Sequence, residues 1–450
     1  MIPRPTPPIT PAGGGRLITS LSADTVGAAN MVRKRNFRRF AADREGRREG
    51  WVKFRPNVTI PQGVQGAPTA DKITLITENV RPNSERSLIV ASKTTIYRYN
   101  YAAGTWTTIG SGYSVNGKRW QSETINGWII LNNAVDLPCS FRVEDSAVVP
   151  LKEMREVGIA AVRWICEYNG FLVCANITEI KADQLASVMN SGDPYGIVSD
   201  VSKLNVIPYQ VTWSEFGQPI NWAPFFTLSQ ASSSATITLP FPSSVFVAGV
   251  TRVAVINGGP GGGTLGGDTA NPDGILVTAV AGNVLTLAIP TTAGLSYPRS
   301  ISVTRWTDIS TIVGSADLQD DASDISGMRR LNKQLVIYRR GGLKKGAVYV
   351  GRYTGSKATP FEFSQRYHGP NVPMFGDCIG VGHDYHLYPA NGNFYTFDGV
   401  NPPAIHVPTS NASELFFTGL KPTDDAWAAD NVTTSEIWFC CPTLTLAYDY

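Results

Sequence analysis

The hydrophobic and polar positions of this chain alternate in short paired runs, and three of the pairs share one layout. In residues 162–177, VRWICEYNGFLVCANI, apolar positions recur with a period of two on both sides of Asn169-Gly170. The same order of strand, Asn-Gly and aromatic strand occurs in residues 120–133 and 386–399. This period is that of a β-strand, and Asn-Gly favours the two-residue turn in which both positions need positive φ. Each stretch therefore predicts a β-hairpin.

Strand-like runs continue through most of the chain from about residue 70. We interpret residues 72–80 as one strand and residues 86–109 as two strands joined by a turn at 102–104. One helical segment of one or two turns is expected within residues 177–196, and no long amphipathic helix is expected elsewhere. Regular strand pairs that each carry a Trp or Tyr favour radial repetition. The pattern therefore predicts an all-β fold, a β-propeller-like ring of antiparallel meanders, in which the repeats are too divergent for the blades to be counted.

Residues 231–305 break this pattern because they are rich in Val, Thr and Ala and nearly free of Trp and Tyr. The change predicts a small β domain inserted between aromatic-rich strands. The chain then has four expected parts. Residues 1–60 form an extended Pro-rich and basic N-terminal arm, and residues 61–230 form the first part of the propeller. Residues 231–305 form the inserted β domain, and residues 306–450 form the second part of the propeller.

The composition fits a chain with a large core and many turns. Of 450 residues, 42% are hydrophobic and 17% are charged, and Gly 43 and Pro 30 suit many short strands joined by turns. The net charge of +3 disfavours a protein dedicated to wrapping DNA. No apolar run is long enough for a membrane-spanning helix, and the first residues lack the apolar core of a secretory signal.

The six cysteines show no CxxC spacing, which disfavours a zinc site or a thioredoxin-like motif. Cys166 and Cys174 flank the Asn169-Gly170 turn, so a disulfide between them is one alternative. Aromatic-rich strands more often hold buried free thiols. We therefore expect reduced, structural cysteines, consistent with assembly in a reducing compartment.

Residues 33–48 carry eight Lys or Arg side chains, opposed there by Asp43 and Glu45 alone. The stretch is either a solvated charge run or a segment that contacts phosphates or an acidic partner surface. Nearby aromatic residues favour docking on a protein, because DNA in transit offers no pocket for them. The candidate contacts with other subunits or with an adaptor protein are Arg33, Lys34, Arg35, Phe37, Arg38, Arg39, Phe40, Arg47, Arg48 and Trp51.

Three motifs resemble catalytic or binding sites without completing one. GGGTLG at residues 261–266 matches a dinucleotide-binding loop, but a turn and a strand follow it instead of a helix. His383 and His386 could share a metal only on a loop, with Asp384 as a third ligand. The acidic residues of LQDDASD (Asp320, Asp321 and Asp324) lack an aromatic platform for sugar cleavage. We therefore expect no enzyme activity, no catalytic residue, no cofactor and no metal ligand.

Several stretches, taken in order, resemble the β-propeller tail proteins of tailed bacteriophages. REGRREGWVKF (residues 44–54) is similar to the basic N-terminal segment of that family, and YQVTWSEFGQPINW (209–222) resembles its Trp-Ser strand and Trp-bearing loop. LVIYRRGGLKKGAVYVG, FEFSQRYHGP and DCIGVGHDYHLYPANGNFYTFDG follow in the family's order. The resemblance covers roughly residues 30–230 and 306–450, and the large inserted β domain departs from it.

The resemblance implies a structural virion protein, the tail nozzle or second tail tubular protein of short-tailed phages. Such a protein forms a homo-oligomeric, six-fold ring below the portal adaptor and around the DNA exit channel, and it offers an outer surface to tail fibres or spikes. Viral DNA would pass through without sequence-specific binding, and assembly would occur in the bacterial host cytoplasm. The alternatives are a sugar-binding or sugar-cleaving propeller protein and an adsorption protein of a long-tailed phage.

Overall fold

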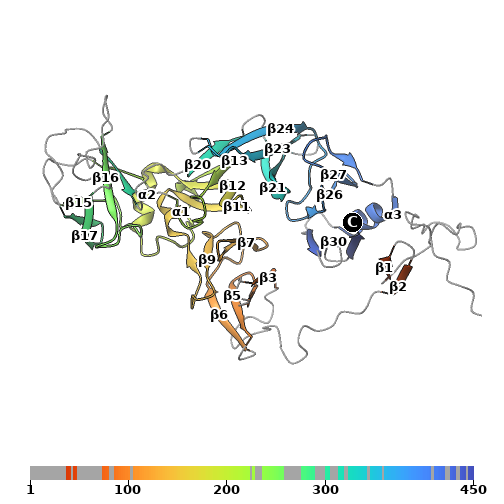
Figure 1. Cartoon of the computed structure of the whole chain (residues 1–450), viewed down its shortest axis with the longest axis horizontal. Helices are drawn as coiled ribbons and strands as arrows, with labels where there is room; N and C mark the ends of the chain where they lie inside the picture. Colours follow the sequence, from red (N-terminus) through yellow and green to blue (C-terminus); the bar gives the residue numbers. More distant parts are fainter. Residues whose placement is uncertain are drawn as a thin grey trace, which may run out of the picture. The chain divides into compact units, whose positions relative to one another are not determined.

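The computed structural model shows a chain built almost entirely of antiparallel strands (Figure 1). The residues it describes are 37–41, 44–47, 73–80, 86–101, 105–222, 225–228, 236–257, 275–288, 299–304, 313–318, 323–341, 345–356, 359–406, 410–420, 426–431, 436–441 and 444–449. Within them lie one 3-10 helix and three short α-helices: η2 (Val201–Lys203), α1 (Lys152–Glu156), α2 (Ala182–Met189) and α3 (Ser410–Gly419). The predicted all-β, propeller-like fold is confirmed.

The chain divides into two compact units, which are described separately. The insert-bearing unit comprises Thr59–Ile325 and Tyr353–Glu362, and the C-terminal unit comprises Met1–Val58, Ser326–Arg352 and Phe363–Tyr450. Each contains four-stranded antiparallel meanders of the kind that form propeller blades. A meander pairs each strand with its sequence neighbour, so the short hairpin turns predicted from the sequence are enough to build it.

Three meanders belong to the insert-bearing unit, in the orders β3-β4-β5-β6, β10-β9-β8-β7 and β11-β12-β13-β20. The third is discontinuous in sequence, because the chain leaves after β13 and returns with β20. The strands are β3 (Leu75–Val80), β4 (Arg86–Ala91), β5 (Thr95–Asn100), β6 (Thr105–Ser111), β7 (Gln121–Ile125), β8 (Trp128–Asn132), β9 (Cys139–Phe141), β10 (Val149–Pro150), β11 (Ile159–Tyr168), β12 (Phe171–Ile180), β13 (Leu204–Trp213) and β20 (Gly314–Asp317).

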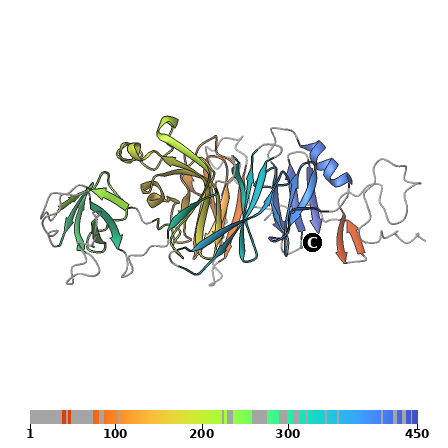
Figure 2. The ribbon, with the colours of Figure 1, turned by 90° about the horizontal axis from the view of Figure 1, so that it is seen from above.

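The excursion between β13 and β20 forms a six-stranded sheet of its own, in the order β14-β19-β16-β17-β18-β15. Figure 2 shows these strands, coloured green, as a group separate from the meanders. The sheet begins before residue 231, because the first strand of the excursion pairs with the last. Its strands are β14 (Phe225–Leu228), β15 (Thr236–Thr238), β16 (Arg252–Asn257), β17 (Ile275–Ala281), β18 (Val284–Leu287) and β19 (Arg299–Thr304).

The C-terminal unit holds the sheets β21-β22-β23-β24, β25-β26-β27-β28 and β29-β30-β31, and the hairpin β1-β2. Its strands are β1 (Phe37–Ala41), β2 (Arg44–Arg47), β21 (Asp324–Leu331), β22 (Gln334–Arg340), β23 (Gly346–Tyr353), β24 (Phe361–His368), β25 (Gly380–Val381), β26 (His386–Ala390), β27 (Asn393–Phe397), β28 (Ala404–Ile405), β29 (Trp427–Asn431), β30 (Glu436–Cys441) and β31 (Leu444–Asp449).

The three Asn-Gly hairpins are confirmed. Asn126, Asn169 and Asn391 have φ of 47°, 49° and 45°, and the glycines that follow them have φ of 80°, 81° and 79°. Positive φ at both turn positions matches the right-handed twist of the flanking strands, which explains why this dipeptide recurs between β7 and β8, β11 and β12, and β26 and β27.

The first meander differs from the prediction, because residues 86–109 form three strands instead of two. The additional turn lies at Ser92–Thr94, where the Ser92 hydroxyl accepts a hydrogen bond from Thr95 N at 3.1 Å and Ser92 N donates to Thr95 O at 2.9 Å. Ser and Thr close this turn without Gly or Pro, so the usual sequence signal is missing. The predicted turn at 102–104 lies outside the described residues.

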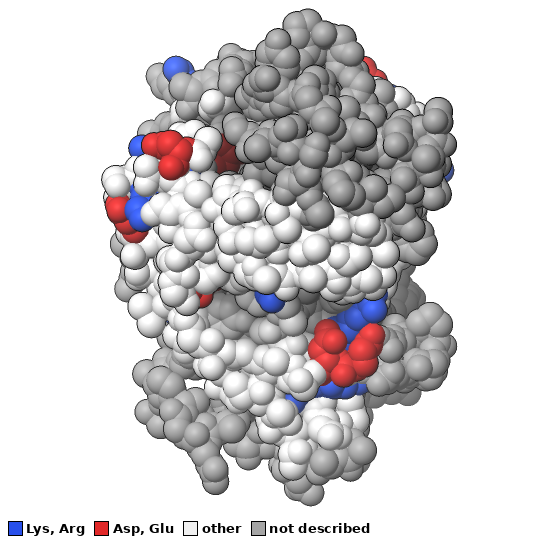
Figure 3. Space-filling model, turned by 90° about the vertical axis from the view of Figure 1, so that its left-hand side faces the viewer, with Lys and Arg blue, Asp and Glu red and all other residues white. Residues whose placement is uncertain are grey.

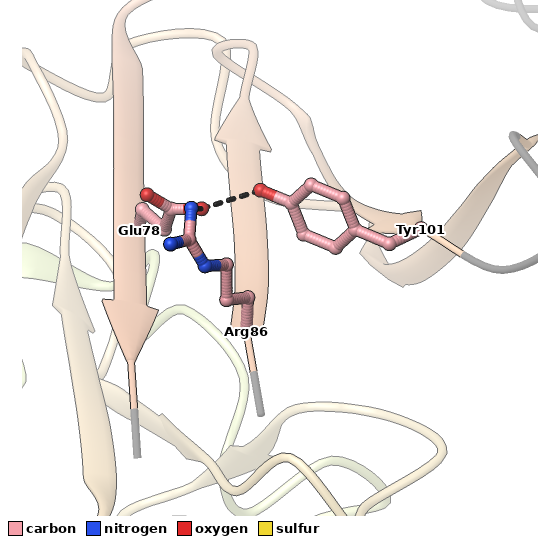
Figure 4. Close-up of polar contacts among 3 residues, drawn as sticks. All are labelled: Glu78, Arg86 and Tyr101. Atoms are coloured by element: carbon pink, nitrogen blue, oxygen red, sulfur yellow. Dashed lines mark hydrogen bonds and ion pairs between the residues drawn. The ribbon is translucent and has the colours of Figure 1, made fainter. Parts of the chain in front are cut away.

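Polar side chains bridge neighbouring strands on the exposed side of this meander (Figure 4). The Tyr101 hydroxyl donates to Glu78 Oε1 at 2.5 Å, and Arg86 Nη1 lies 3.9 Å from the same oxygen. Arg86 is the first residue of β4 and pairs with Val80, two residues beyond Glu78 in β3. Exposed ion pairs of this kind contribute little to stability, so the meander depends on its apolar face.

Separate apolar clusters hold the sheets together. One joins the first two meanders around Ile89, Trp120 and Phe141, and another packs around Tyr338, Tyr388 and Phe397 in the C-terminal unit. The six cysteines are buried and form no disulfide in the described structure, Cys166 and Cys174 included. Burial raises the pKa of the Cys139 thiol to about 12. This cysteine therefore packs as a small apolar side chain.

Candidate interaction surfaces

The structure places half of the candidate contact residues. Phe37, Arg38, Arg39 and Phe40 lie in β1, and Arg47 lies in β2 opposite Phe37. The two strands form an antiparallel hairpin with an irregularity between Arg39 and Ala41. The other candidates lie outside the described residues: Arg33, Lys34, Arg35, Arg48 and Trp51. A role for this segment in subunit or adaptor contacts stays a prediction.

A second candidate surface, which sequence reasoning missed, lies where three turns of the insert-bearing unit meet. The loop after β13 lies against the β11–β12 turn, with Gly217 N donating to Gly170 O at 2.7 Å. Asn126 Nδ2, from the β7–β8 turn, donates to Gly217 O at 2.9 Å. The Asn-Gly turns of two meanders are thereby tied to one loop, which we call the tip loop (residues 214–222).

Aromatic rings gather beneath the tip loop. Phe171, the first residue of β12, lies 5.4 Å from the Phe216 ring, 5.0 Å from Phe361 and 5.7 Å from Tyr353, measured between ring centroids. Phe361 also contacts Trp213 at 5.0 Å in an edge-to-face arrangement. Edge-to-face pairs add to the stability gained from burying the rings. The cluster therefore fixes the tip loop on the sheet below it.

Two members of this aromatic cluster remain open to solvent. Phe216 is 54% exposed and Tyr353 is 40% exposed, whereas Phe171 is fully buried. Gly170 allows the close approach of Phe216, since a Cβ there would lie 2.9 Å from the ring. Half-exposed aromatic rings on a rigid base are favourable contact points for proteins and other ligands. Trp213 and Phe361 are buried and support this surface from below, so Phe216 and Tyr353 are the members that a partner could reach.

A polar junction connects the third meander to the inserted sheet, and helix α1 is its centre. Glu153 Oε2 accepts a hydrogen bond from Trp222 N at 3.1 Å, and Arg155 Nη2 donates to Gly196 O at 2.9 Å. Lys152 Nζ lies 5.4 Å from the centre of the Tyr195 ring. Glu153 thus holds the tip loop, whereas Arg155 and Lys152 hold the loop between α2 and β13, so α1 acts as a bracket between two segments.

Glu156 makes the direct link to the insert. Its carboxylate accepts hydrogen bonds from Ser243 Oγ at 2.5 Å, from Ser244 N at 2.7 Å and from Ser244 Oγ at 2.5 Å. The Tyr195 hydroxyl donates to the same group at 3.4 Å. Burial and the adjacent Glu156 raise the pKa of Tyr195 to about 12, so the phenol keeps its proton. A buried carboxylate is thus satisfied by hydroxyl and amide donors.

Arg155 lies in the same junction and is almost fully buried, at 1% exposure. Burial lowers its pKa to about 10, and Asp193 acts in the opposite direction. Two of its donors, Nε and Nη1, have no acceptor among the described residues. Because the guanidinium still holds Gly196 O, its role in the junction is to fix the loop between α2 and β13.

Helix α2 packs on both sides of the junction. Val188 belongs to a cluster with Ala160 and Ile180 of the third meander. Met189 belongs to the core of the inserted sheet, which includes Phe241, Phe246 and Leu285, and Leu185 and Ala186 pack against that core. The helix predicted within 177–196 is confirmed as Ala182–Met189, although Ile177–Ile180 belong to β12. The insert therefore shares its core with the propeller-like part.

The other sequence candidates are not brought together. His386 is fully buried at the start of β26, whereas His383 is 89% exposed and lies 3.9 Å from Asp384. Asp324 is exposed at the start of β21. Asp320, Asp321 and residues 261–266 lie outside the described residues. Among the residues the structure does describe, no group of three His, Cys, Asp or Glu side chains is placed to hold a metal.

Comparisons with known proteins give no family assignment. No family model matches the chain, and no curated protein matches it. Solved structures with similar folds include virginiamycin B lyase from Staphylococcus aureus (TM-score 0.30, 13% identity, 84% of this chain and 96% of that one). Dipeptidyl peptidase 4 from Porphyromonas gingivalis has a TM-score of 0.29 and 12% identity over 84% of this chain and 52% of that one. AztD from Citrobacter koseri has a TM-score of 0.27 and 11% identity over 84% of this chain and 93% of that one. These likenesses are too low to carry a functional argument.

No helix in the described part of the chain is both long enough and apolar enough to span a membrane.

Proposed function

We propose that this chain is a structural protein of a bacteriophage tail. It assembles into a homo-oligomeric ring, with six-fold symmetry, as a nozzle below the portal adaptor and around the DNA exit channel. It gives tail fibres or spikes a surface for attachment and serves genome ejection mechanically and electrostatically, without enzyme activity. The ring is assembled in the bacterial host cytoplasm and functions in the virion.

The observation that carries the proposal is the meeting of two family-like stretches. Trp213 and Phe361 stand far apart in the sequence, yet their rings lie 5.0 Å apart in the aromatic cluster. In the first stretch, Trp213 and Trp222 are both buried, and Trp222 N is held by Glu153. Two of the five stretches that carry the resemblance therefore meet in one aromatic cluster, which supports the proposed architecture. This support concerns the architecture, and the tail role follows from the resemblance.

The aromatic surface favours a second candidate function, sugar binding. Phe216 and Tyr353 are half exposed, and Glu215 adjoins Phe216 in the sequence. Glu167 Oε1 accepts from Gly170 N at 2.9 Å, and Gly170 lies against the Phe216 ring. Exposed aromatic faces beside acidic groups suit a sugar-binding surface. A glycan-binding screen of the intact chain, repeated with Phe216→Ser, distinguishes this function from a ring role. Sugar binding that is lost in the variant would support it.

Ring assembly is tested through the basic segment. Changing Arg33, Arg35, Arg38 and Arg39 together to Ser should leave the melting temperature almost unchanged, because surface charges contribute little to fold stability. It should abolish rings in native mass spectrometry and incorporation into particles. A matched control changes four exposed basic residues elsewhere: Lys118, Lys345, Arg352 and Arg366. Intact rings from the first variant, with altered DNA retention in particles, would instead assign the segment to DNA contact.

A further inference from the structure

The turn between β11 and β12 places an unheld side-chain amide next to an unhindered backbone nitrogen. Asn169 is exposed, and its side chain makes no hydrogen bond to another residue that the structure describes. Gly170 has no Cβ, so nothing on its own residue obstructs the approach of its nitrogen to the Asn169 side chain. A backbone nitrogen that attacks the Cγ of the preceding asparagine displaces ammonia and forms a succinimide. The turn therefore holds an electrophile beside a nucleophile.

Glu167 provides a base for this nucleophile. Its Oε1 accepts a hydrogen bond from Gly170 N at 2.9 Å, so the carboxylate already contacts the proton that the nitrogen must lose. This distance lies within the reach required of a general base. Another Asn-Gly pair lacks such a group, because Gly117 N donates to the carbonyl oxygen of Ser114 at 3.0 Å, and a carbonyl is too weak a base to take the proton.

The other two Asn-Gly hairpins hold the amide that would have to leave. Asn126 Nδ2 donates to Gly217 O at 2.9 Å. Asn391 Nδ2 donates to Pro370 O at 2.9 Å and to Asn371 Oδ1 at 3.1 Å. These hydrogen bonds must break before ammonia can depart, which raises the barrier. Since the three turns have nearly the same φ, their side-chain contacts distinguish them.

We propose that Asn169 is a site of spontaneous covalent modification, at which the folded chain converts asparagine to aspartate or isoaspartate. Gly170 N attacks the Cγ of Asn169 while Glu167 takes the proton from that nitrogen and passes it to the side-chain amide. The bond between Cγ and Nδ2 breaks, and ammonia leaves. Water then opens the succinimide at either of its carbonyl carbons. The inference does not depend on the proposed tail role.

The modification changes the tip loop, because this loop is fixed on the reacting turn. Gly170 O accepts from Gly217 N at 2.7 Å, and the Phe216 ring lies against Gly170. Isoaspartate adds one carbon to the backbone just before Gly170 and displaces both contacts. Either product also adds a carboxylate. The reaction is thus a slow, one-way change in the aromatic surface to which the half-exposed Phe216 belongs.

The test follows the purified full chain at neutral pH in isotopically labelled water, by peptide mapping with mass spectrometry. Asn169 should convert about fivefold faster than Asn126 or Asn391, because their amides are held by hydrogen bonds. The same chain unfolded in urea is the matched control, since the three asparagines all precede glycine and should there convert at similar rates.

Ion-exchange chromatography gives a second readout. Each conversion lowers the net charge of the chain by one unit, from +3 to +2 for the first. On the face that Figure 3 shows, the charged side chains of the described residues form a few small groups among uncharged ones. One added carboxylate should therefore shift the elution of the modified chain, and the shifted fraction should show faster amide exchange at Gly217.

Glu167→Gln tests the base. The glutamine retains an oxygen that can accept from Gly170 N but cannot take its proton, so conversion of Asn169 should slow by about tenfold. Glu144→Gln is the matched control, because this exposed carboxylate pairs with Arg142 and should leave the rate unchanged.

Two results would overturn the proposal. One is conversion of Asn126 or Asn391 in the folded parent as fast as that of Asn169, a comparison that needs no variant. The other is conversion of Asn169 in Glu167→Gln at the parent's rate or faster, in a variant whose melting temperature shows that it is folded.

Discussion

The hydroxyl of Tyr338 lies 2.9 Å from Nδ1 of His386, in a core where both side chains are fully buried. The other ring nitrogen, Nε2, lies 3.1 Å from the carbonyl oxygen of Arg330. A carbonyl only accepts, so Nε2 carries the proton and donates it, while Nδ1 accepts from Tyr338. Both nitrogens of the neutral ring are thereby satisfied. Burial lowers the pKa of His386 to about 4.

This histidine should make the fold sensitive to acid. Its pKa is 6.5 when unfolded and about 4 when folded, so below pH 6.5 the unfolded state binds the proton first and stability falls. The loss develops between pH 6.5 and about 4 and amounts to about 3 kcal/mol at roughly 1.4 kcal/mol per pKa unit. Denaturant unfolding across this range should show the free energy of unfolding fall with pH. His386→Gln should remove this fall, whereas the exposed His383→Gln should retain it.

The Asn-Gly turns offer a test of the tip loop. Gly127 and Gly170 have nearly the same φ, 80° and 81°, but a Cβ on Gly127 meets nothing within 4 Å, whereas one on Gly170 meets the Phe216 ring at 2.9 Å. Gly127→Ala should therefore cost only backbone strain, about 1 kcal/mol, and Gly170→Ala should cost roughly 1 kcal/mol more.

A double-mutant cycle isolates the steric part of that difference. Combining Gly170→Ala with Phe216→Ala should bring the cost of the glycine change back to that of Gly127→Ala. Thermal melts of the parent, the two single variants, the double variant and Gly127→Ala supply the comparison. If Gly170→Ala costs no more than Gly127→Ala, Phe216 does not lie on this turn.

Glu156 should be a major determinant of the junction. Glu156→Ala leaves the donors of Ser243 and Ser244 without an acceptor, which should cost about 3 kcal/mol and speed amide exchange in residues 243–251. Glu156→Gln retains one acceptor oxygen, so its stability should lie between that of the parent and that of Glu156→Ala. Glu144→Ala is the comparison, because its pair with Arg142 is exposed and worth about 0.5 kcal/mol. Unchanged exchange in Glu156→Ala would reject a bracket role for α1.

Removal of the insert should depend on where the cuts are made. A deletion of residues 231–305 leaves β14 without its partner β19 and strips the cover from Leu185 and Met189. We expect that protein to aggregate. A deletion of residues 223–312, closed by a Gly/Ser linker and carrying Leu185→Gln and Met189→Gln, should remain soluble and melt cooperatively. Soluble yield and calorimetry compare the two, and equal behaviour would mean that α2 does not contribute to the core of the insert.

The hairpins could be predicted because their signals are local. Asn126, Asn169 and Asn391 stand beside glycines between alternating strands, and the dipeptide alone determines the turn. The turn at Ser92–Thr94 was missed because its hydrogen bonds use hydroxyl groups and not glycine. Helix α1 was missed because its five residues, KEMRE, are too few to show a period.

The junction and the aromatic surface could not be predicted, because they depend on contacts between distant residues. Nothing near Glu156 in the sequence indicates that Ser243 and Ser244 will bind it. The meeting of Phe171 and Phe361 likewise requires the fold to be known. The change in composition at residue 231 indicated a separate sheet, but pairing placed its first strand at Phe225–Leu228. Composition averages over a window and cannot identify the partner of a single strand.

The segment between β13 and β20 leaves and re-enters the sheet at two residues that face each other, because Trp213 pairs directly with Gly314. A segment that departs and returns at neighbouring positions can be exchanged without changing the register on either side. Recombination at this residue pair would replace one inserted module by another while the surrounding meander keeps its strand pairing. The same scaffold could then acquire a new contact surface in a single genetic event, provided that the incoming module presents an apolar face to α2.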